Sequence, residues 1–403
     1  MTRKIFVFSI IFVVALVSVV FIVDHFRDEQ NILEPQDDLT QYQEFLPGDE
    51  GEEDYPMLSD DPPFEYVSDE PIAGDASSPW HRSHFANVRA PQPLGADTPH
   101  GEISVRHIRH LNDHFYSRFP FSYQEKAAAV WLIEELLAIG HPWENIYVQE
   151  FNLDSLGLDP SIVSRWGLFG AIYRNYDYLR YTYTSQNVIL TIPGQSQQVI
   201  VVGAHYDTLL YPGASDNASG TALLLESAQR MMHIDNYYTL VYIFFGAEEV
   251  GLLGAEYFVN SLTPDELDNI LFMVNADVLF EGEYFVFGGG YATQNAPNER
   301  RENDISRQWE AMAYELNRNA GLELVNYPDA IFLSSDQLEF LRAEITVMML
   351  FGAQFDDAGR WYLRVLHSYR DDYHYIMNRW PEKIHDAMRT FSIFLEEVLL
   401  ARY

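Results

Sequence analysis

Cysteine is absent from the 403-residue sequence. Disulfide bonds, thiolate metal ligands, cysteine nucleophiles and a lipid-modified cysteine are therefore excluded. An exported protein of this size without disulfides is more typical of a bacterial surface than of eukaryotic secretion.

Positive charge is also scarce, because 25 Lys and Arg stand against 60 Asp and Glu, for a formal charge of −35. Nucleic-acid binding needs the opposite sign, so we expect no nucleic-acid partner. The imbalance is strongest in residues 28–78, which hold 17 Asp or Glu and no Lys or Arg. Self-repulsion and low hydrophobicity predict a disordered acidic linker there, either as a plain spacer or as a binding tract.

One apolar run, residues 5–23, has the length of about 20 residues that a helix needs to cross a bilayer. Arg3 and Lys4 precede it and Asp24 follows, which predicts a cytoplasmic N-terminus. We therefore expect residues 1–27 to be a transmembrane signal-anchor. The rest would be extracytoplasmic, at a bacterial cell surface or in the periplasm. A signal peptide that is cleaved is the alternative interpretation.

Residues 79–403 have a globular composition and alternate between helical and strand patterns. This alternation predicts an α/β domain with a mostly parallel central sheet flanked by helices on both faces. The Tyr- and Arg-rich segment 154–184 breaks the rhythm and is expected to be an insertion. The expected helices are 103–118, 122–140, 218–232, 254–261, 302–320 and 381–401. The expected strands are 145–151, 186–192, 199–204, 239–246, 270–277, 284–287 and 345–350.

The strands 186–192 and 199–204 are predicted to be neighbours, because only a short connection with the turn signal Pro193-Gly194 separates them. The strand 284–287 is expected to end before three consecutive glycines, residues 288–290.

Polar side chains gather where the predicted strands end. In an open α/β sheet the chemistry lies beyond the carboxyl ends of the strands. Up to six carboxylates would meet two imidazoles there, and no Lys occurs in these motifs. One or more divalent cations would relieve this charge excess. Imidazole and carboxylate without thiolate suit zinc, with manganese or cobalt possible. The side chains concerned are His205, Asp207, Asp216, Glu248, Glu249, Asp277, His367 and Asp371.

Taken singly, each of these residues has an ordinary structural interpretation. Asp216 alone would be a helix N-cap or a turn residue, and Glu248 with Glu249 alone would be a solvated pair. The joint pattern favours a metal site, because every candidate follows a predicted strand or lies in its return loop.

Six motifs resemble those of the bimetallic zinc aminopeptidases, the twenty-eighth metallopeptidase family, which includes aminopeptidase S and aminopeptidase Y. They are AHYD, GASDNASG, FFGAEEVGLLGAEYF, VNAD, SSDQLEF and HSYRDD. The resemblance covers about residues 101–401 and implies a zinc-peptidase fold of the phosphorylase/hydrolase type. It also implies two zinc ions per chain and peptide substrates.

The resemblance assigns a role to five metal ligands. His205 and Asp277 would bind one zinc ion, and Glu249 and His367 would bind the other. Asp216 would bridge both ions, with a cis peptide bond following it.

The resemblance also implies the catalytic groups. Glu248 would be the general base that takes a proton from a zinc-activated water. Its neighbour Glu249 would point the other way, as successive residues do in an extended segment. Asp207 and Asp371 would orient His205 and His367, respectively, from outside the ligand shell.

Two positions depart from the family pattern. Some members carry a Tyr that stabilises the oxyanion where this chain has Leu366. Tyr211, Tyr369 or Tyr373 could replace it, or the metal alone could serve. Gln337 stands where many relatives have His, which puts a contact of the substrate pocket in doubt.

The sequence therefore predicts a membrane-anchored, extracytoplasmic metallo-aminopeptidase that acts on peptides. A carboxypeptidase-type activity is an alternative, because four arginines could bind a substrate carboxylate: Arg342, Arg360, Arg364 and Arg370. A glutaminyl cyclase and a non-catalytic, receptor-like relative are further alternatives. No feature indicates an oligomeric state.

Overall fold

The computed structural model describes residues 94–95, 97–156, 182, 184–355 and 361–403. The expected anchor, the acidic linker and most of the expected insertion lie outside these residues. Within the described ranges, no helix has both the length and the apolar character needed to span a bilayer.

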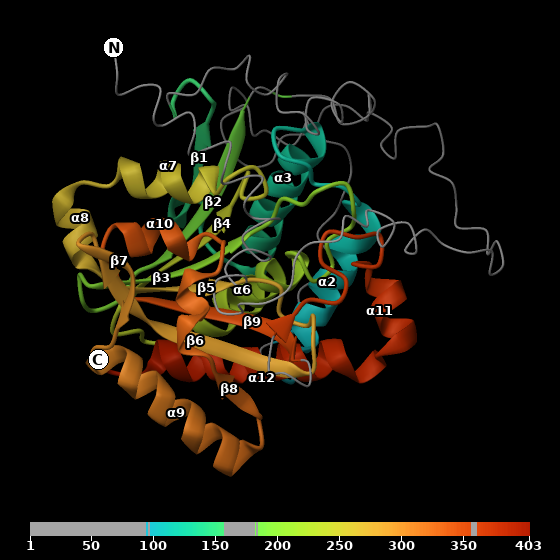
Figure 1. Cartoon of the computed structure of the whole chain (residues 1–403). Coiled ribbons are helices and arrows are strands. Elements are labelled where there is room, and N and C mark those ends of the chain that lie inside the picture. Colours follow the sequence, from blue (N-terminus) through green and yellow to red (C-terminus); the bar gives the residue numbers. More distant parts are fainter. Residues whose placement is uncertain (1–93, 96, 157–181, 183, 356–360) are drawn as a thin grey trace, which may run out of the picture. The chain divides into compact units, whose positions relative to one another are not determined.

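Four parallel strands form the centre of the sheet (Figure 1). They are adjacent in the order β4 (Thr239–Phe245), β3 (Val199–His205), β5 (Ile270–Ala276) and β9 (Val347–Phe355). Their sequences are almost continuous apolar runs, as is typical of strands covered on both faces. The parallel arrangement that was expected is confirmed for this centre.

The flanks of the sheet are mainly antiparallel, so the sheet as a whole is mixed rather than mostly parallel. The strand β2 (Ser185–Ile192) runs antiparallel to β4, and β6 (Tyr284–Thr293) runs antiparallel to β9. The remaining strands are β1 (Ile146–Phe151), β7 (Ala296–Arg301), β8 (Leu324–Asn326) and β10 (Trp361–Tyr362).

The predicted pairing of β2 with β3 is wrong, because β4 lies between them. The connection between β2 and β3 crosses the start of β4, where Ser196 donates its amide to the carbonyl oxygen of Tyr237 at 2.7 Å. A Cβ on Gly194 would lie 2.3 Å from the carbonyl of Tyr238. The Pro-Gly pair therefore permits two segments of the backbone to cross closely instead of closing a hairpin.

Helices cover both faces of the sheet, as predicted (Figure 1). Side chains alternate along β3, so that Ile200 and Val202 enter a large core and Val201 enters a smaller one on the opposite face. The large core packs against α2 (Glu102–His114), α3 (Tyr123–Ile139), α6 (Ala218–Met231), α9 (Asp304–Ala320), α11 (Tyr373–Arg379) and α12 (Pro381–Leu400). The smaller core packs against α7 (Leu253–Ser261), α8 (Pro264–Asn269) and α10 (Gln337–Arg342). Short 3₁₀ turns are η3 (Trp143–Asn145) and η5 (Pro328–Phe332).

Several predicted boundaries differ from the structure, and three ends differ by four residues or more. The strand predicted at 345–350 is β9, which continues to Phe355. The first helix ends at His114, so Arg118 lies in the loop after it. The strand β6 continues through its three glycines to Thr293. A Cβ on Gly289 would lie 2.5 Å from the ring of Trp309, so glycine there allows α9 to pack closely on the strand.

The order of the central strands creates a switch point beside β3. The chain leaves β3, passes through α6 to β4 on one side, and then returns to β5 on the other side. Loops that leave these strands consequently diverge at their carboxyl ends and open a crevice there.

Candidate metal centre

The residues predicted at the strand ends meet at this crevice. His205 is the last residue of β3, Asp277 follows β5 directly, and Glu248 and Glu249 lie in the turn after β4. The side chains of His205, Asp277 and Glu249 are between 1% and 8% exposed. The sheet therefore holds them in a nearly dry environment.

Asp216 enters the site from the loop before α6. Asn217 caps this helix by accepting from the amide of Gly220 at 2.8 Å, and its own amide group donates to the carbonyl of Ala276 at 2.9 Å. These bonds tie the start of α6 to the end of β5. The peptide bond between Asp216 and Asn217 is cis, as the family resemblance implied.

The donor atoms form two groups of three. In the first, the His205 group, ligand atoms of His205, Glu248 and Asp277 lie within 4.8 Å of one another. In the second, the His367 group, ligand atoms of Asp216, Glu249 and His367 meet the same limit.

Asp216 connects the His205 group with the His367 group. Its Oδ1 lies 3.2 Å from Nε2 of His205, and its Oδ2 lies 3.0 Å from Nε2 of His367. Nε2 of His205 also lies 3.2 Å from Oδ1 of Asp277, and Nε2 of His367 lies 3.2 Å from Oε2 of Glu249. Each carboxylate oxygen of Asp216 thus faces a different imidazole.

Without a cation, the site holds more carboxylate than its imidazoles neutralise. Burial raises the pKa of Glu248 well above its usual range and that of Glu249 to about 7, with further contributions from neighbouring carboxylates. Burial opposes the charge on His367, yet Glu249 and Asp216 raise its pKa to about 12. Hydrogen bonds from both imidazoles lower the pKa of Asp216 despite its burial. These opposed shifts mark a cluster of charges that a cation would stabilise.

Arg118 is a buried cation that the sequence interpretation missed. Its guanidinium is fully buried and donates to backbone carbonyls, including that of Pro212 at 2.8 Å and that of Gly213 at 3.3 Å. It forms no ion pair with any described residue. Burial lowers its pKa to about 10, although Asp207 and Asp371 oppose this change. Arg118 therefore holds the loop between β3 and Asp216 and offsets part of the negative charge.

Asp207 fixes the turn that carries the two adjacent glutamates. Its Oδ1 accepts from the amide of Glu248 and its Oδ2 from the amide of Glu249, both at 3.1 Å. The turn begins with Ala247 at a φ of 55°, so Glu248 and Glu249 are not in the extended segment that was expected. The hydrogen bonds of Asp207 place the two side chains in separate groups instead.

Asp207 contacts His205 by a hydrogen bond to its backbone carbonyl, whereas its carboxylate oxygen Oδ1 lies 3.6 Å from Nδ1 of His205. Nδ1 of His205 donates to the backbone carbonyl of Asp207 at 3.1 Å, which leaves Nε2 free to act as a ligand.

Asp371 contacts different groups from the expected ones. Its carboxylate accepts from the amides of Ser215 and Asp216, at 2.6 and 2.9 Å. Asp371 was predicted to orient His367. In the structure its carboxylate instead fixes the backbone of Asp216. Burial raises the pKa of Asp371 well above its usual range.

Two further buried carboxylates near the site were not recognised. Glu125 accepts from the amides of Phe121 and Ala247, at 2.7 and 3.1 Å. Asp336 is fully buried, and neither carboxylate oxygen has a hydrogen-bond partner among the described residues. Asp336 lies in the quoted motif SSDQLEF, but its burial depends on tertiary packing that the motif does not encode.

An open cleft adjoins the His367 group. Tyr211 lines it, whereas Tyr369 is 52% exposed and hydrogen-bonds with Arg370. Tyr373 is buried and starts α11. Of the three tyrosines considered as substitutes at Leu366, Tyr211 is the one that faces the cleft. The lining residues are Thr208, Leu209, Tyr211, Gly213, Asp216, Glu249, His367, Ser368 and Asp371.

Gln337 does not contribute to the cleft. Its side chain is fully buried, accepts from the amide group of Asn275 at 2.9 Å and donates to the carbonyl of Leu333 at 2.6 Å. The residue that stands in place of the family's His is thus part of the core.

The donor set fits divalent cations. Imidazole nitrogens and carboxylate oxygens, without thiolate, are ligands that zinc accepts. Both groups offer three such atoms within 4.8 Å, and Asp216 offers one oxygen to each histidine.

The fold is shared with zinc peptidases of known structure. BSAP, a zinc aminopeptidase from Bacillus subtilis, superposes with a TM-score of 0.57 at 17% identity, over 77% of this chain and 96% of that one. A glutaminyl cyclase from an Acidobacteriales bacterium superposes with a TM-score of 0.52 at 16% identity, over 77% of this chain and 99% of the other. The chain therefore has a fold that zinc peptidases and a glutaminyl cyclase share.

Sequence similarity identifies the family of the chain among the proteins that share this fold. The alkaline phosphatase isozyme conversion protein of Escherichia coli K12 is 25% identical over 274 residues, 64% of this chain and 74% of that protein. Aminopeptidase YwaD of Bacillus subtilis 168 is 38% identical over 100 residues, which span 24% of this chain and only 22% of YwaD. The profile of Peptidase family M28 matches residues 187–392, just over half of the chain. The chain therefore belongs to peptidase family M28, a family of metallopeptidases, and the predicted family is confirmed.

Proposed function

We propose that the chain is a two-zinc aminopeptidase that removes N-terminal residues from peptides. The observation that carries this proposal is the position of Asp216 between two complete groups of donor atoms, with one carboxylate oxygen toward each histidine. His205 and Asp277 would hold one ion, Glu249 and His367 the other, and Asp216 both. The name of YwaD and the fold of BSAP support the same activity.

When bound, two zinc ions supply Lewis-acid chemistry, polarising the scissile carbonyl and acidifying the attacking water. Asp207 holds the amides of Glu248 and Glu249 and so keeps their side chains in different groups. Burial makes Glu248 more basic than an ordinary glutamate, which suits a group that takes a proton near neutral pH. Glu248 then passes this proton to the amine that leaves.

The charge of the cleft supports recognition of an N-terminal amine. The described lining holds three carboxylates and no Lys or Arg. The arginines suggested for a carboxypeptidase are engaged elsewhere: Arg342 pairs with Glu339 and Arg364 with Glu283. Arg370 lies over the ring of Tyr369, and Arg360 lies outside the described residues. An ammonium group complements such a cleft better than a carboxylate does.

Glutaminyl cyclization is the alternative that shares this fold. The presence of both donor groups favours hydrolysis, because the cyclase chemistry that the resemblance implies requires one zinc ion. A direct assay of ring closure on an N-terminal glutamine peptide separates the two activities.

The decisive experiment uses the full chain and a Glu248→Gln variant, with Glu256→Gln in α7 as a matched control. Hydrolysis of a panel of aminoacyl-p-nitroanilides is measured with zinc and with a chelator, alongside bound metal. We expect about two zinc ions in all three proteins, activity that the chelator abolishes, and no activity in Glu248→Gln alone. A wild-type protein that binds two zinc ions but cleaves no substrate of the panel would refute the aminopeptidase activity. Fewer than two metals in the wild type would refute the ligand assignment.

We also propose that residues 1–27 anchor the enzyme in the membrane. Residues 28–78 would then hold the catalytic domain away from the extracytoplasmic face of that membrane. The apolar run and its flanking charges support this orientation. Protease added to spheroplasts, which lack an outer barrier, should release an active fragment. Activity that this protease cannot reach would contradict the orientation.

A further inference from the structure

The loop that carries His367 differs from the rest of the metal centre. The side chain of His367 is 45% exposed, whereas that of Asp216 is 6% and that of His205 is 1% exposed. His367 lies outside the regular helices and strands, and its φ of 52° is in the left-handed region that side chains other than glycine seldom adopt. Such a conformation persists only where surrounding contacts determine it. The backbone contacts of this loop therefore contribute to the position of His367.

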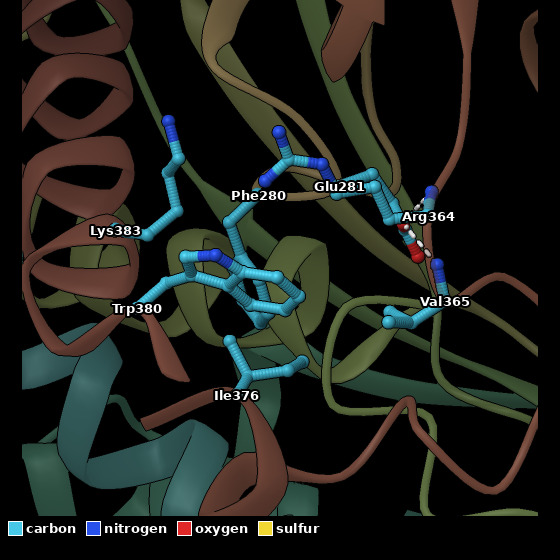
Figure 2. A pocket seen from close by; sticks show the side chains of 7 residues that line it. All are labelled: Phe280, Glu281, Arg364, Val365, Ile376, Trp380 and Lys383. Carbon is cyan, nitrogen blue, oxygen red and sulfur yellow. Dashed lines mark hydrogen bonds between the residues drawn. The ribbon is translucent and has the colours of Figure 1, made fainter. Parts of the chain in front are cut away.

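Glu281 provides such contacts from the connection between β5 and β6. One of its carboxylate oxygens, Oε2, accepts from the amide of Arg364 at 2.6 Å and from the amide of Val365 at 2.8 Å (Figure 2). Glu281 is only 2% exposed, so these charge-assisted bonds are shielded from water.

Val365 transmits this contact toward the ligand. Its carbonyl accepts from the amide of Ser368 at 3.1 Å and from the hydroxyl of Ser368 at 2.6 Å. Val365 precedes His367 by two residues. Its amide is bound by Glu281, and its carbonyl is bound by Ser368, the residue that follows His367. The backbone on both sides of His367 is anchored at one residue, and Glu281 fixes that residue.

The same arrangement recurs at the other loops of the site. Asp207 accepts from two successive amides at Glu248 and Glu249, and Asp371 from two successive amides at Ser215 and Asp216. Glu281 is the counterpart of these carboxylates for the loop of His367. This recurrence distinguishes it from an isolated buried glutamate.

We propose that Glu281 is a positioning residue for the His367 group and that it determines whether this group retains its metal. The inference rests on the proposed two-zinc function, but concerns the affinity of one ion rather than the reaction. The hydrogen bonds of Glu281 in the described structure are to the backbone amides of Arg364 and Val365, not to the proposed ligand side chains. It acts through the backbone of residues 364–368.

The chain supplies a matched control two residues away. Glu283 pairs with the side chain of the same Arg364 at 3.0 Å, but it is 58% exposed and accepts from no backbone amide in the described structure. Replacing Glu283 therefore removes a charge beside the same loop and leaves the backbone bonds of Glu281 in place.

The test measures zinc retained by the full chain against a competing chelator, for wild type, Glu281→Met, Glu281→Gln and Glu283→Gln. We expect Glu281→Met to lose one of two zinc ions, with affinity at that position reduced roughly 10–100-fold. Glu281→Gln, which keeps one acceptor oxygen, should lose less, and Glu283→Gln should match wild type. Cooperative unfolding of each variant confirms that it is folded. Should Glu281→Met not fold, an unchanged Glu281→Gln would overturn the proposal.

A second measurement is independent of bound metal. Hydrogen exchange of the amides of Arg364 and Val365, in protein stripped of zinc, should be slow in wild type, at least tenfold faster in Glu281→Met, and increased to a smaller extent in Glu281→Gln. Two retained metals together with unchanged exchange would overturn the role of Glu281. A wild type that binds zinc but cleaves no peptide would refute the proposed function and leave this inference standing.

Discussion

Replacing Asp207 by Asn tests how the turn after β4 is held. In the wild type each carboxylate oxygen accepts one amide, from Glu248 and from Glu249, at 3.1 Å. An asparagine offers one oxygen and one NH₂ group, so in either orientation one buried amide faces another donor. The size of Asn equals that of Asp, which keeps the packing constant.

The expected cost follows from these two bonds. A hydrogen bond to a charged group contributes about 1.5–3 kcal/mol, and a stranded buried donor costs a further ~1–3 kcal/mol. We therefore expect the free energy of unfolding to fall by roughly 2.5–6 kcal/mol in the metal-free protein. Because the turn also carries Glu249, zinc affinity should fall roughly 10–100-fold.

Urea unfolding with chelator present measures the first quantity, and chelator competition measures the second. Asp268→Asn, on the exposed surface of α8, is the control for the change of charge. An Asp207→Asn protein whose stability and zinc affinity both equal those of Asp268→Asn would refute the reasoning, because the turn would then not depend on these bonds.

Two further predictions concern stability away from the donor atoms. Burial raises the pKa of Glu135 from its usual 4.5 to about 7, so the folded state binds this proton more tightly than the unfolded state. Wild type should lose roughly 3 kcal/mol of stability relative to Glu135→Gln as the pH rises from 4.5 through 7, and parallel urea curves would contradict this. A Cβ on Gly220 would lie 2.1 Å from the carbonyl oxygen of Ala276, so Gly220→Ala should destabilise by about 1–3 kcal/mol. Gly95→Ala, which meets nothing within 4 Å, is its control, and equal melting temperatures would exclude the clash.

Local patterns in the sequence predicted the longer elements but not their order. The short elements α8, α10, α11, β7, β8 and β10 were not predicted. The predicted ends of α3 and α9 agree with the structure, where Gly140 and Gly321 adopt the left-handed conformation of a helix C-cap; glycine is common at that position. The position of β4 between β2 and β3 could not be predicted. It depends on a close backbone crossing at Gly194, and a Pro-Gly pair is equally compatible with a hairpin.

The same limit applies to the site. The side chains that carry the chemistry follow their strands in the sequence, so His205, Asp277 and the two glutamates were found by position. Arg118 and Glu281 were not found, because their contacts are with backbone groups far away in the sequence. A bond to a backbone amide leaves no mark on the identity of the partner residue, so sequence motifs do not reveal such contacts.

The insertion of β4 between β2 and β3 has a consequence for synthesis of the chain. When β3 leaves the ribosome, β4 and β5, its two neighbours in the sheet, have not yet been made. The apolar residues and backbone groups of β3 therefore stay unpaired until β4 and β5 are synthesised. Nascent chains with exposed, unpaired strands are prone to aggregate. The edge that gathers His205, Glu249 and Asp277 therefore forms late, after a long stretch of chain has been translated. A chaperone that shields an unpaired strand would have its greatest effect during this interval.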